Sequence, residues 1–416
     1  MRLYDTLARK KREFSPLRGR QVRMYTCGPS VYAYSHIGNF RTYLFEDVLV
    51  RYLRYKGHKV KRVMNITDVE DKAVRAARKE GRTPAQSQAP KIRDFFSTWD
   101  DLGMLRPTIV AKASAHVPQM ISLIRKMCTR GYCIPDNDGL YFNVRKFRGY
   151  GALRRLRSPR YFGKAREDDY SKEGLWDFRL WKKWAPSDGG VKWASPFGAG
   201  RPGWHIECSA ISMHYLGSPF DIHTGGSDNI FPHHDNEIAQ SIAATGKMPA
   251  NFWLHARHLT VRKKKMSKRT GNVLYAHELM EQGIKPMCLR YYLISERYRS
   301  RLDFTMGKMK SALREMGRIR QILKALEEHS RKKGNGKMHP SLAKLLASGF
   351  EAAMDDDLHT RLAFRRTFRL LRRAERLLRG GKLSPADARG IIRAIRRIDS
   401  VLGVLGQRQI NEACIS

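Results

Sequence analysis

Several absences narrow the class of this 416-residue chain. No apolar run approaches the roughly 20 residues that a membrane-spanning helix needs. The basic N-terminus lacks the apolar stretch of a secretory signal, and its acidic residues and direct entry into a strand argue against a transit peptide. No G-x-G-x-x-G motif follows the first predicted strand, so the dinucleotide-binding fingerprint is absent. We therefore expect a cytoplasmic protein without membrane partners.

Cysteine is scarce, with 6 residues and no C-x-x-C pair. A disulfide scaffold is not expected in a chain of this length, and the spacing favours free thiols in a reducing compartment. Two of the cysteines, Cys27 and Cys208, stand inside motifs discussed below. The others are interpreted as small buried hydrophobic residues: Cys128, Cys133, Cys288 and Cys414.

Acidic residues are also few. The chain has 39 Asp and Glu against 80 Lys and Arg, which gives a net charge of +41. An excess of this size favours a polyanionic partner such as nucleic acid, although a solvated surface or an arginine-rich lineage would also produce it. The hydrophobic content of 42% is that of a globular protein. The length predicts two to four domains.

The N-terminal pattern is strand, helix, strand. Residues 22–27 read as a buried strand that ends at Gly28, residues 39–56 carry apolar residues at helical spacing, and residues 58–66 form a second strand. Such a unit predicts a parallel sheet. Residues 111–197 interrupt it with a helix at 117–130, turn signals, a basic stretch and a tryptophan cluster, and residues 202–243 resume it.

The C-terminal third is predicted to be a helical bundle. Its helices are expected at 309–328, 341–353 and 360–379. A last helix has Ser384 as its N-cap and Pro385 at its first position, followed by one apolar face. The chain is expected to become helical directly after the basic loop at 262–269.

Four scattered residues could bind zinc. His233 and Glu237 are four residues apart, so on a helix they share one face. Cys27 ends the first strand, near the edge where parallel sheets place their sites, and Cys208 lies in a Gly-Trp-His-Ile-Glu-Cys-Ser segment. Thiolates, imidazole and carboxylate are all accepted zinc ligands. His234 is an alternative to His233, but one helical turn to Glu237 favours His233.

Two further segments suggest a nucleotide site. Ser35-His36-Ile37-Gly38-Asn39 falls between strand and helix, where backbone N–H groups and the helix dipole attract phosphate. Lys265-Met266-Ser267-Lys268-Arg269 places ammonium groups on a loop, suited to the charge on a leaving pyrophosphate. Either motif alone is weak, but the pair predicts ATP chemistry. The lysines just before Lys265 are interpreted as a solvated basic run.

With these motifs the chain resembles the cysteinyl-tRNA synthetases, which are class I aminoacyl-tRNA synthetases. The resemblance covers almost the whole length, through landmarks in order at 26–32, 65–68, 177–182, 200–209, 231–237 and 354–358. It implies a Rossmann-like α/β catalytic domain at 1–110 and 198–250, with a connective insertion at 111–197. A bridging segment with the Lys268 loop at 251–307 and an all-α helical bundle for tRNA binding at 308–416 would follow.

The resemblance also implies the reaction and its residues. L-cysteine would be activated by ATP with Mg²⁺ to cysteinyl-adenylate and transferred to the 3′ end of tRNA(Cys), by a monomer holding one Zn²⁺ that binds the substrate thiolate. The residues implied to be catalytic are His36, Asn39, Lys265 and Lys268. Those implied to bind substrate and ATP are Gly28, Thr67, Trp204, Gly226, Asp228 and again Lys268. Those implied to bind the metal are Cys27, Cys208, His233 and Glu237.

The chain departs from the family pattern in three places and in length. Asn39 stands where many members have His, Thr224 replaces a Gly, and Arg269 replaces a Ser. The chain stops soon after Leu405, where longer members continue into a domain that recognises the anticodon. We therefore expect the basic bundle surface to carry more of the tRNA contact, with the following arginines as candidates: Arg365, Arg366, Arg372 and Arg373.

Two other functions fit parts of the pattern. The cysteine ligase of mycothiol biosynthesis keeps zinc and both nucleotide motifs but joins cysteine to an amino sugar. The charge of +41, Glu237 and the acidic landmark at 355–357 argue against it. A catalytically inactive RNA-binding paralogue is the second alternative, and the presence of His36, Lys268 and all four metal positions argues against that.

Overall fold

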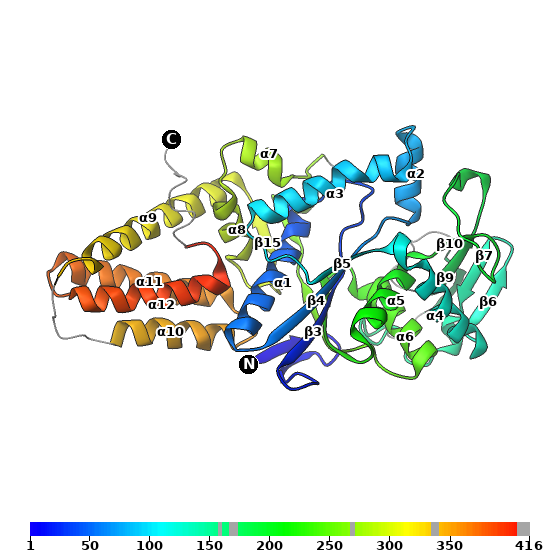
Figure 1. The fold of residues 1–416 in the computed structure, drawn as a ribbon, viewed down its shortest axis with the longest axis horizontal. Helices are drawn as coiled ribbons and strands as arrows, with labels where there is room; N and C mark the ends of the chain where they lie inside the picture. Colours follow the sequence, from blue (N-terminus) through cyan, green and yellow to red (C-terminus); the bar gives the residue numbers. More distant parts are fainter. Residues whose placement is uncertain (157–159, 166–173, 267–270, 334–340, 406–416) are drawn as a thin grey trace.

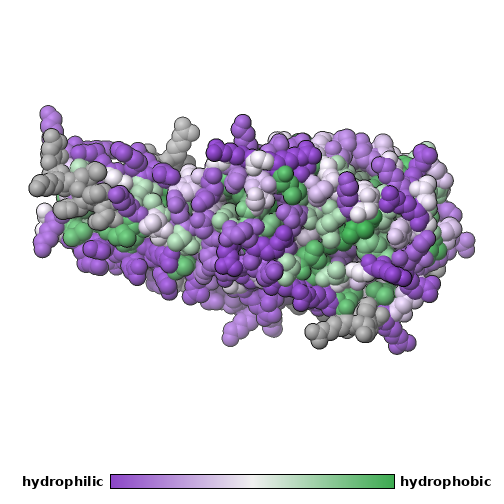
Figure 2. All heavy atoms as spheres, turned by 90° about the horizontal axis from the view of Figure 1, so that it is seen from below, coloured by the Kyte–Doolittle hydropathy of each residue, from purple (hydrophilic) through white to green (hydrophobic). Residues whose placement is uncertain are grey.

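The computed structural model describes all residues except 157–159, 166–173, 267–270, 334–340 and 406–416 (Figure 1). The molecule is elongated, with a parallel sheet in the middle, a mixed α/β lobe at one end and a helical bundle at the other. Among the described helices, none is long and apolar enough to cross a bilayer. Hydrophilic residues cover most of the face shown in Figure 2, with scattered hydrophobic areas between them.

The central sheet confirms the predicted parallel α/β architecture. Its strand order is β12–β11–β3–β4–β5, and every neighbouring pair is parallel. The strands are β3 (Gln21–Thr26), β4 (Lys59–Ile66), β5 (Ile109–Lys112), β11 (Phe220–Gly226) and β12 (Ala250–Ala256). From β3 the chain runs outward through β4 and β5, then returns to the other side of β3 as β11. The carboxyl ends of β3 and β11 therefore form the switch point where open parallel sheets place their ligands.

Helix α1 (Ile37–Tyr55) crosses from β3 to β4 and is largely buried against the sheet and neighbouring helices. Its N-terminus is fixed by a capping box. The His36 ring accepts from the backbone N–H of Asn39, and the Asn39 side chain accepts from the backbone N–H of His36. Apolar residues at helical spacing then form the core face, which includes Phe40, Leu44 and Val48. After β4 come α2 (Asp71–Lys79) and α3 (Pro84–Asp101).

The lobe between β5 and β11 is a second, largely antiparallel sheet with the order β10–β9–β7–β6. Its elements are α4 (Val117–Thr129), β6 (Cys133–Asp136), β7 (Gly139–Phe142), β8 (Tyr161–Lys164), which pairs with β9, β9 (Leu175–Lys183) and β10 (Gly200–Pro202). Helices α5 (Trp204–Leu216) and α6 (Asp235–Thr245) bring the chain back to the parallel sheet. Because β10 pairs with β9 and β12 pairs with β11, the lobe extends past the predicted boundary at 197 and the parallel sheet past the one at 250.

Among the described residues after the basic loop at 262–269, the chain forms helices as expected, with one short strand at Leu302–Phe304 as the exception. A small sheet with the order β14–β13–β15 joins β13 (Leu259–Val261) and β14 (Lys264–Lys265) to β15 (Leu302–Phe304), with α7 (Ala276–Glu281) and α8 (Pro286–Ile294) between them. An N-terminal hairpin of β1 (Arg2–Asp5) and β2 (Lys10–Glu13) was also not predicted. These strands are too short to show a sequence period.

The C-terminal region is the predicted helical bundle. Its helices are α9 (Met306–Ser330), α10 (Ser341–Met354), α11 (Thr360–Arg379) and α12 (Pro385–Leu402). The bounds of α11 agree with the prediction, and the Ser384 hydroxyl caps α12 by accepting from the backbone N–H of Asp387, as expected. Helix α10 packs on α11 and α12, and α9 packs on the same two helices.

A disulfide joins Cys128 to Cys133, so the expectation that both are free, buried thiols is wrong. Cys128 lies near the end of α4 and Cys133 begins β6. The tight turn between these elements reverses the chain and brings the two Cα atoms to 4.8 Å. Cys288 lies outside this disulfide and is fully buried, as expected, and Cys414 lies outside the described residues.

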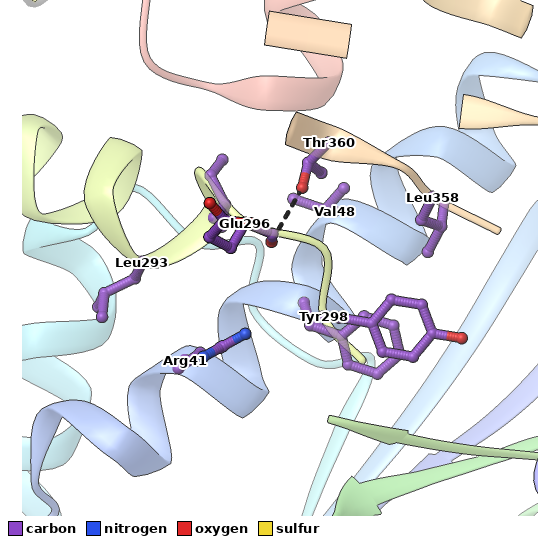
Figure 3. Close-up of a pocket in the computed structure, with 9 residues that line it drawn as sticks. Arg41, Val48, Leu293, Glu296, Tyr298, Leu358 and Thr360 are labelled. Atoms are coloured by element: carbon purple, nitrogen blue, oxygen red, sulfur yellow. Dashed lines mark hydrogen bonds between the residues drawn. The ribbon is translucent and has the colours of Figure 1, made fainter. Parts of the chain in front are cut away.

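Between the parallel sheet and the bundle lies a cavity of about 20 Å³, lined by residues of α1, α8 and the start of α11 (Figure 3). Arg41 projects toward it, and burial lowers the pKa of Arg41 to about 10. The Thr360 hydroxyl donates to the carbonyl of Glu296 at the cavity wall. The volume holds about one water molecule, so we interpret this cavity as a packing gap at the domain joint.

Candidate active site

A cavity of about 740 Å³ opens at the carboxyl ends of β3 and β11, the switch point of the parallel sheet. This volume is typical of a small-molecule site. The structure brings together there the predicted site residues Cys27, Gly28, His36, Asn39, Thr67, Trp204, Cys208, Gly226, Asp228, His233 and Lys265. Glu237 lies directly behind the lining, against Cys27 and His233. Lys268 lies outside the described residues.

The four predicted metal ligands form one buried cluster in which all donor atoms lie within 4.8 Å of one another. The Cys27 and Cys208 sulfurs are 3.8 Å apart, and Glu237 Oε1 lies 3.9 Å from the Cys27 sulfur and 3.1 Å from His233 Nε2. A tetrahedral ion with sulfur ligands at about 2.3 Å requires a sulfur–sulfur separation of about 3.8 Å. The donor set and its spacing therefore fit zinc.

The other groups around His233 also suit a metal ligand. His233 Nδ1 lies 2.8 Å from His205 Nδ1, which leaves Nε2 directed at the cluster. The indole of Trp204 stacks on the His233 ring, with centroids 4.5 Å apart. Ligating histidines usually have such a partner on the second ring nitrogen, because it fixes the orientation of the ring.

A second donor set overlaps the first and consists of Cys27, His223, His234 and Glu237. His234 Nε2 lies 3.3 Å from the Cys27 sulfur, and His223 Nε2 lies 2.8 Å from Glu237 Oε2. Burial and the neighbouring histidines lower the pKa of His234 well below its usual value, so the ring is neutral and can accept a metal or a hydrogen bond. The motifs included His234 only as an alternative, and they did not single out His223.

The two thiols differ in their environment. Burial, followed by the neighbouring Cys208, raises the pKa of Cys27 well above its usual value. Burial also opposes ionisation of Cys208, but the hydrogen bond with Cys27 and the nearby His233 outweigh it and lower the pKa of Cys208 to about 6. The site thus favours at least one thiolate at neutral pH, the form that binds a metal.

The start of α1 brings the two predicted nucleotide motifs into contact. A Cβ atom on Gly38 would lie 2.5 Å from Cε of Met266, so the absence of a side chain lets the second motif pack onto the helix N-terminus. His36 and Asn39 line the cavity beside this contact. Asn39 takes the capping role at the third helical position.

The loop after β3 packs tightly against the end of β4. A Cβ on Gly28 would lie 1.6 Å from the backbone oxygen of Asn65, so only glycine fits. The backbone N–H of Gly28 donates to the Asn65 side chain, whose amide in turn donates to the Thr67 hydroxyl at 2.9 Å. Thr67 is 2% exposed and lines the cavity floor. This network fixes Gly28 and Thr67 beside Cys27.

On the opposite wall, Gly226 ends β11 and Asp228 follows it. Asp228 is half exposed, and its carboxylate lies 3.9 Å from His258 Nδ1. A Cβ on Gly226 would lie 2.5 Å from Asp228 Oδ1. Lys265, the last residue of β14, is exposed and lines the same cavity. The cavity therefore joins a soft-donor cluster to a helix N-terminus and an open, polar wall.

Comparison with known proteins places this geometry in a family. A model described as the class I (C) tRNA synthetase catalytic domain matches residues 13–314, and a DALR domain model matches residues 349–406. The chain is 40% identical to a cysteine–tRNA ligase of Chlamydia trachomatis, covering 97% of this chain and 87% of that one. It is 39% identical to a cysteine–tRNA ligase of Koribacter versatilis, covering 97% and 82%.

The fold also matches more distant structures. A methionyl-tRNA synthetase of Mycobacterium tuberculosis in complex with methionyl-adenylate superposes with a TM-score of 0.70 at 14% identity, covering 95% of this chain and 93% of that one. At this identity the match shows the fold alone. From the matched models and the near full-length relatives, the chain belongs to the cysteine–tRNA ligase family of class I tRNA synthetases.

Proposed function

We propose that the cavity activates L-cysteine with ATP to give cysteinyl-adenylate and pyrophosphate, then transfers the cysteinyl group to the 3′ end of tRNA(Cys). The observation that carries this proposal is the buried Cys27, Cys208, His233 and Glu237 cluster inside the cavity, next to the N-terminus of α1. A zinc site with a purely structural role would not need to line a substrate cavity. A zinc site that selects a thiol substrate must line that cavity.

These four residues would hold one Zn²⁺. When bound, zinc offers a position for the thiolate of cysteine that the hydroxyl of serine fills poorly at neutral pH. Trp204 and Thr67, which line the same cavity, would enclose the rest of the amino acid. A site built around one such contact rejects the wrong amino acid strongly enough that editing is not required.

The nucleotide would lie along the start of α1. The positive end of the α1 dipole and His36 suit the phosphates, and Asn39 supports His36 through the capping box. Gly226 and Asp228 would contact the adenosine. Lys265 and Lys268 would stabilise the charge on the leaving pyrophosphate, which carries Mg²⁺. The carboxylate of cysteine attacks the α-phosphate, so catalysis rests on positioning and electrostatics.

The bundle would bind the tRNA. Arg365, Arg369 and Arg373 recur every fourth residue on the exposed face of α11. Two of the arginines proposed from the sequence have structural partners instead, because Arg366 donates to the carbonyl of Gly349 and Arg372 pairs with Glu315. The tRNA contact is therefore better assigned to the exposed row.

Replacing the exposed row by glutamine should weaken tRNA binding and reduce its salt dependence, by about one unit of slope for each phosphate that is no longer neutralised. Replacement by lysine keeps the charge and serves as the control. Unchanged affinity and slope in the glutamine variant would remove the bundle from the tRNA site.

Cysteine-dependent exchange of pyrophosphate into ATP tests the activation step. We expect exchange with cysteine and none with serine, together with about one zinc per chain by elemental analysis. Transfer of labelled cysteine to tRNA but not to an amino sugar then separates the proposal from an amino-sugar ligase. Absence of exchange in zinc-loaded protein would favour an inactive RNA-binding protein. Sedimentation of the active protein tests the expected monomer.

A further inference from the structure

Three aromatic rings stand together, two of which line the large cavity, and the proposed contacts with cysteine and ATP do not use them. We call Tyr34, Tyr275 and His277 the rim cluster. The rings of Tyr275 and His277 stack at 5.6 Å, and Tyr34 meets both edge-on at 6.4 and 6.2 Å. Tyr34 comes from the loop before α1, whereas Tyr275 and His277 lie at the start of α7.

The rim cluster is held in position. The backbone N–H of Ile37 donates to the carbonyl of Leu274 at 3.0 Å, which ties the two segments together. His277 Nδ1 lies 3.1 Å from the Asp94 carboxylate on α3. Three separate parts of the chain therefore fix these rings, which is more than a chance surface contact requires.

Two of the three rings are also well exposed. Tyr34 is 41% exposed, and the His277 side chain is 41% exposed. Eight large hydrophobic side chains are exposed in the part of the chain that the structure describes, and among them only Tyr32 and Tyr34 line the large cavity. Exposed aromatic faces at the entrance of a polar cavity are typical of a surface that stacks on a planar ligand.

Charge and position identify the ligand. Lys72 and Lys265 line the same cavity, so cationic groups lie within it together with the rings. Rings combined with cationic groups form the usual site for unpaired nucleotides, because bases stack on the rings and phosphates pair with the lysines. The contacts proposed for cysteine and ATP use other residues of the same cavity. The remaining substrate that must cross the rim is the unpaired 3′ end of tRNA.

We propose that the rim cluster is a stacking platform for the unpaired 3′-terminal nucleotides of tRNA. This inference rests on the proposed function and adds a binding site to it. Stacking on rings tolerates any base, so the platform positions the 3′ end without reading its sequence.

The test compares Tyr34→Ala, Tyr34→Phe and the control Trp184→Ala, which removes an exposed ring that does not line the cavity. Tyr34→Ala should lower kcat/KM for tRNA charging by roughly 5- to 150-fold, the range expected when one base no longer stacks. Cysteine-dependent pyrophosphate exchange should keep its kcat and its KM for ATP. Tyr34→Phe should charge tRNA normally, because it retains the ring.

A second measurement uses tRNA shortened by its unpaired 3′ nucleotides. Shortening should weaken binding to the wild-type protein but have little effect on binding to Tyr34→Ala. Equal weakening in both proteins overturns the platform, as does normal charging by Tyr34→Ala. A raised KM for ATP in exchange would assign the ring to adenine instead. If Tyr34→Ala does not fold, the same comparisons apply to His277→Ala. Failure of exchange in the wild type would refute the proposed function itself.

Discussion

The joint between the catalytic sheet and the bundle depends on one fully buried ion pair, Asp47 with Arg290. Both side chains are 0% exposed, and Arg290 Nη2 donates to Asp47 Oδ2 at 2.6 Å. Arg290 also donates to the carbonyl oxygens of Leu402, at the end of α12, and Leu102, after α3. A single guanidinium therefore connects α1, α8, α12 and the segment after α3.

We predict that Arg290→Met lowers the free energy of unfolding by about 3–5 kcal/mol, the usual effect of removing one partner of a buried pair. Asp47 would keep only the half-buried Arg51 as a charged partner, and two buried carbonyls would lose their donor. Most proteins have only about 5–15 kcal/mol of stability, so the bundle should detach in low urea. Urea unfolding followed by tryptophan fluorescence measures the change.

A double-mutant cycle with Asp47→Asn isolates the pair, and the combined variant should lose less stability than the sum of the single losses. Burial would raise the pKa of Asp47, but Arg290, Arg51 and the Leu105 amide outweigh burial and lower it. The stabilisation is therefore complete above the unfolded pKa of about 3.9 and is lost as pH falls through the lower folded value. A loss of stability below about 1 kcal/mol in Arg290→Met is typical of an exposed pair. It would show that water reaches the Asp47–Arg290 pair.

Three other changes test the site and its surroundings. Gly28→Ala should abolish both pyrophosphate exchange and tRNA charging, because its Cβ would lie 1.6 Å from a backbone oxygen. The control Gly317→Ala, whose Cβ would enter open space on α9, should instead gain roughly 0.5–1 kcal/mol of stability. Cys208→Ala should reduce zinc content and cysteine-dependent exchange together, whereas retained zinc would contradict the ligand assignment. Cys128→Ser should cost about 2 kcal/mol by loop entropy, and thiol labelling of the native wild type at Cys128 or Cys133 would show that the bond is absent.

The long elements could be predicted from the sequence because local signals agreed with the tertiary fold. Helix α11 keeps one apolar face over its whole length and stops at Gly380, so both predicted bounds match. The strands β13, β14 and β15 could not be found in this way. They have two or three residues each, and β13 pairs not only with the adjacent β14 but also with β15, which lies beyond α7 and α8 in the chain. Their pairing depends on packing that no local pattern records.

The metal site, too, could be predicted only in part from the sequence. Cys27 and Cys208 lie 181 residues apart in the chain, so their 3.8 Å separation could not come from spacing. Their motifs identified them through the family resemblance. The motifs gave no sign that His223 and His205 would contact the cluster, because their contacts with Glu237 and His233 join parts of the chain that only the fold brings together. The disulfide was wrongly excluded because Cys128 and Cys133 meet only after a turn reverses the chain.

The connective lobe also supports the metal site from behind. Helix α4 packs on α5, which carries Cys208, and on α6, which carries Glu237. Asp235, at the start of α6, accepts the backbone N–H groups of Leu153 and Arg154 from the lobe at 2.9 and 3.0 Å. Asp235→Ala breaks this attachment without touching a ligand atom.

Groups that hydrogen-bond metal ligands usually contribute 10- to 100-fold to metal affinity. Asp235 acts on the ligand helix from one step further out, so we expect Asp235→Ala to weaken zinc binding by up to roughly 10-fold. A chelator competition titration measures it without reference to activity. The exposed Asp100→Ala serves as control, because Asp100 and its partner Arg106 lie at the end of α3 and just after it, far in sequence from α6. If zinc affinity in Asp235→Ala equals that of the control, the lobe does not position α6. Its contact with the ligand helices would then be packing alone, and the cluster would be fixed by the parallel sheet and by its own hydrogen bonds.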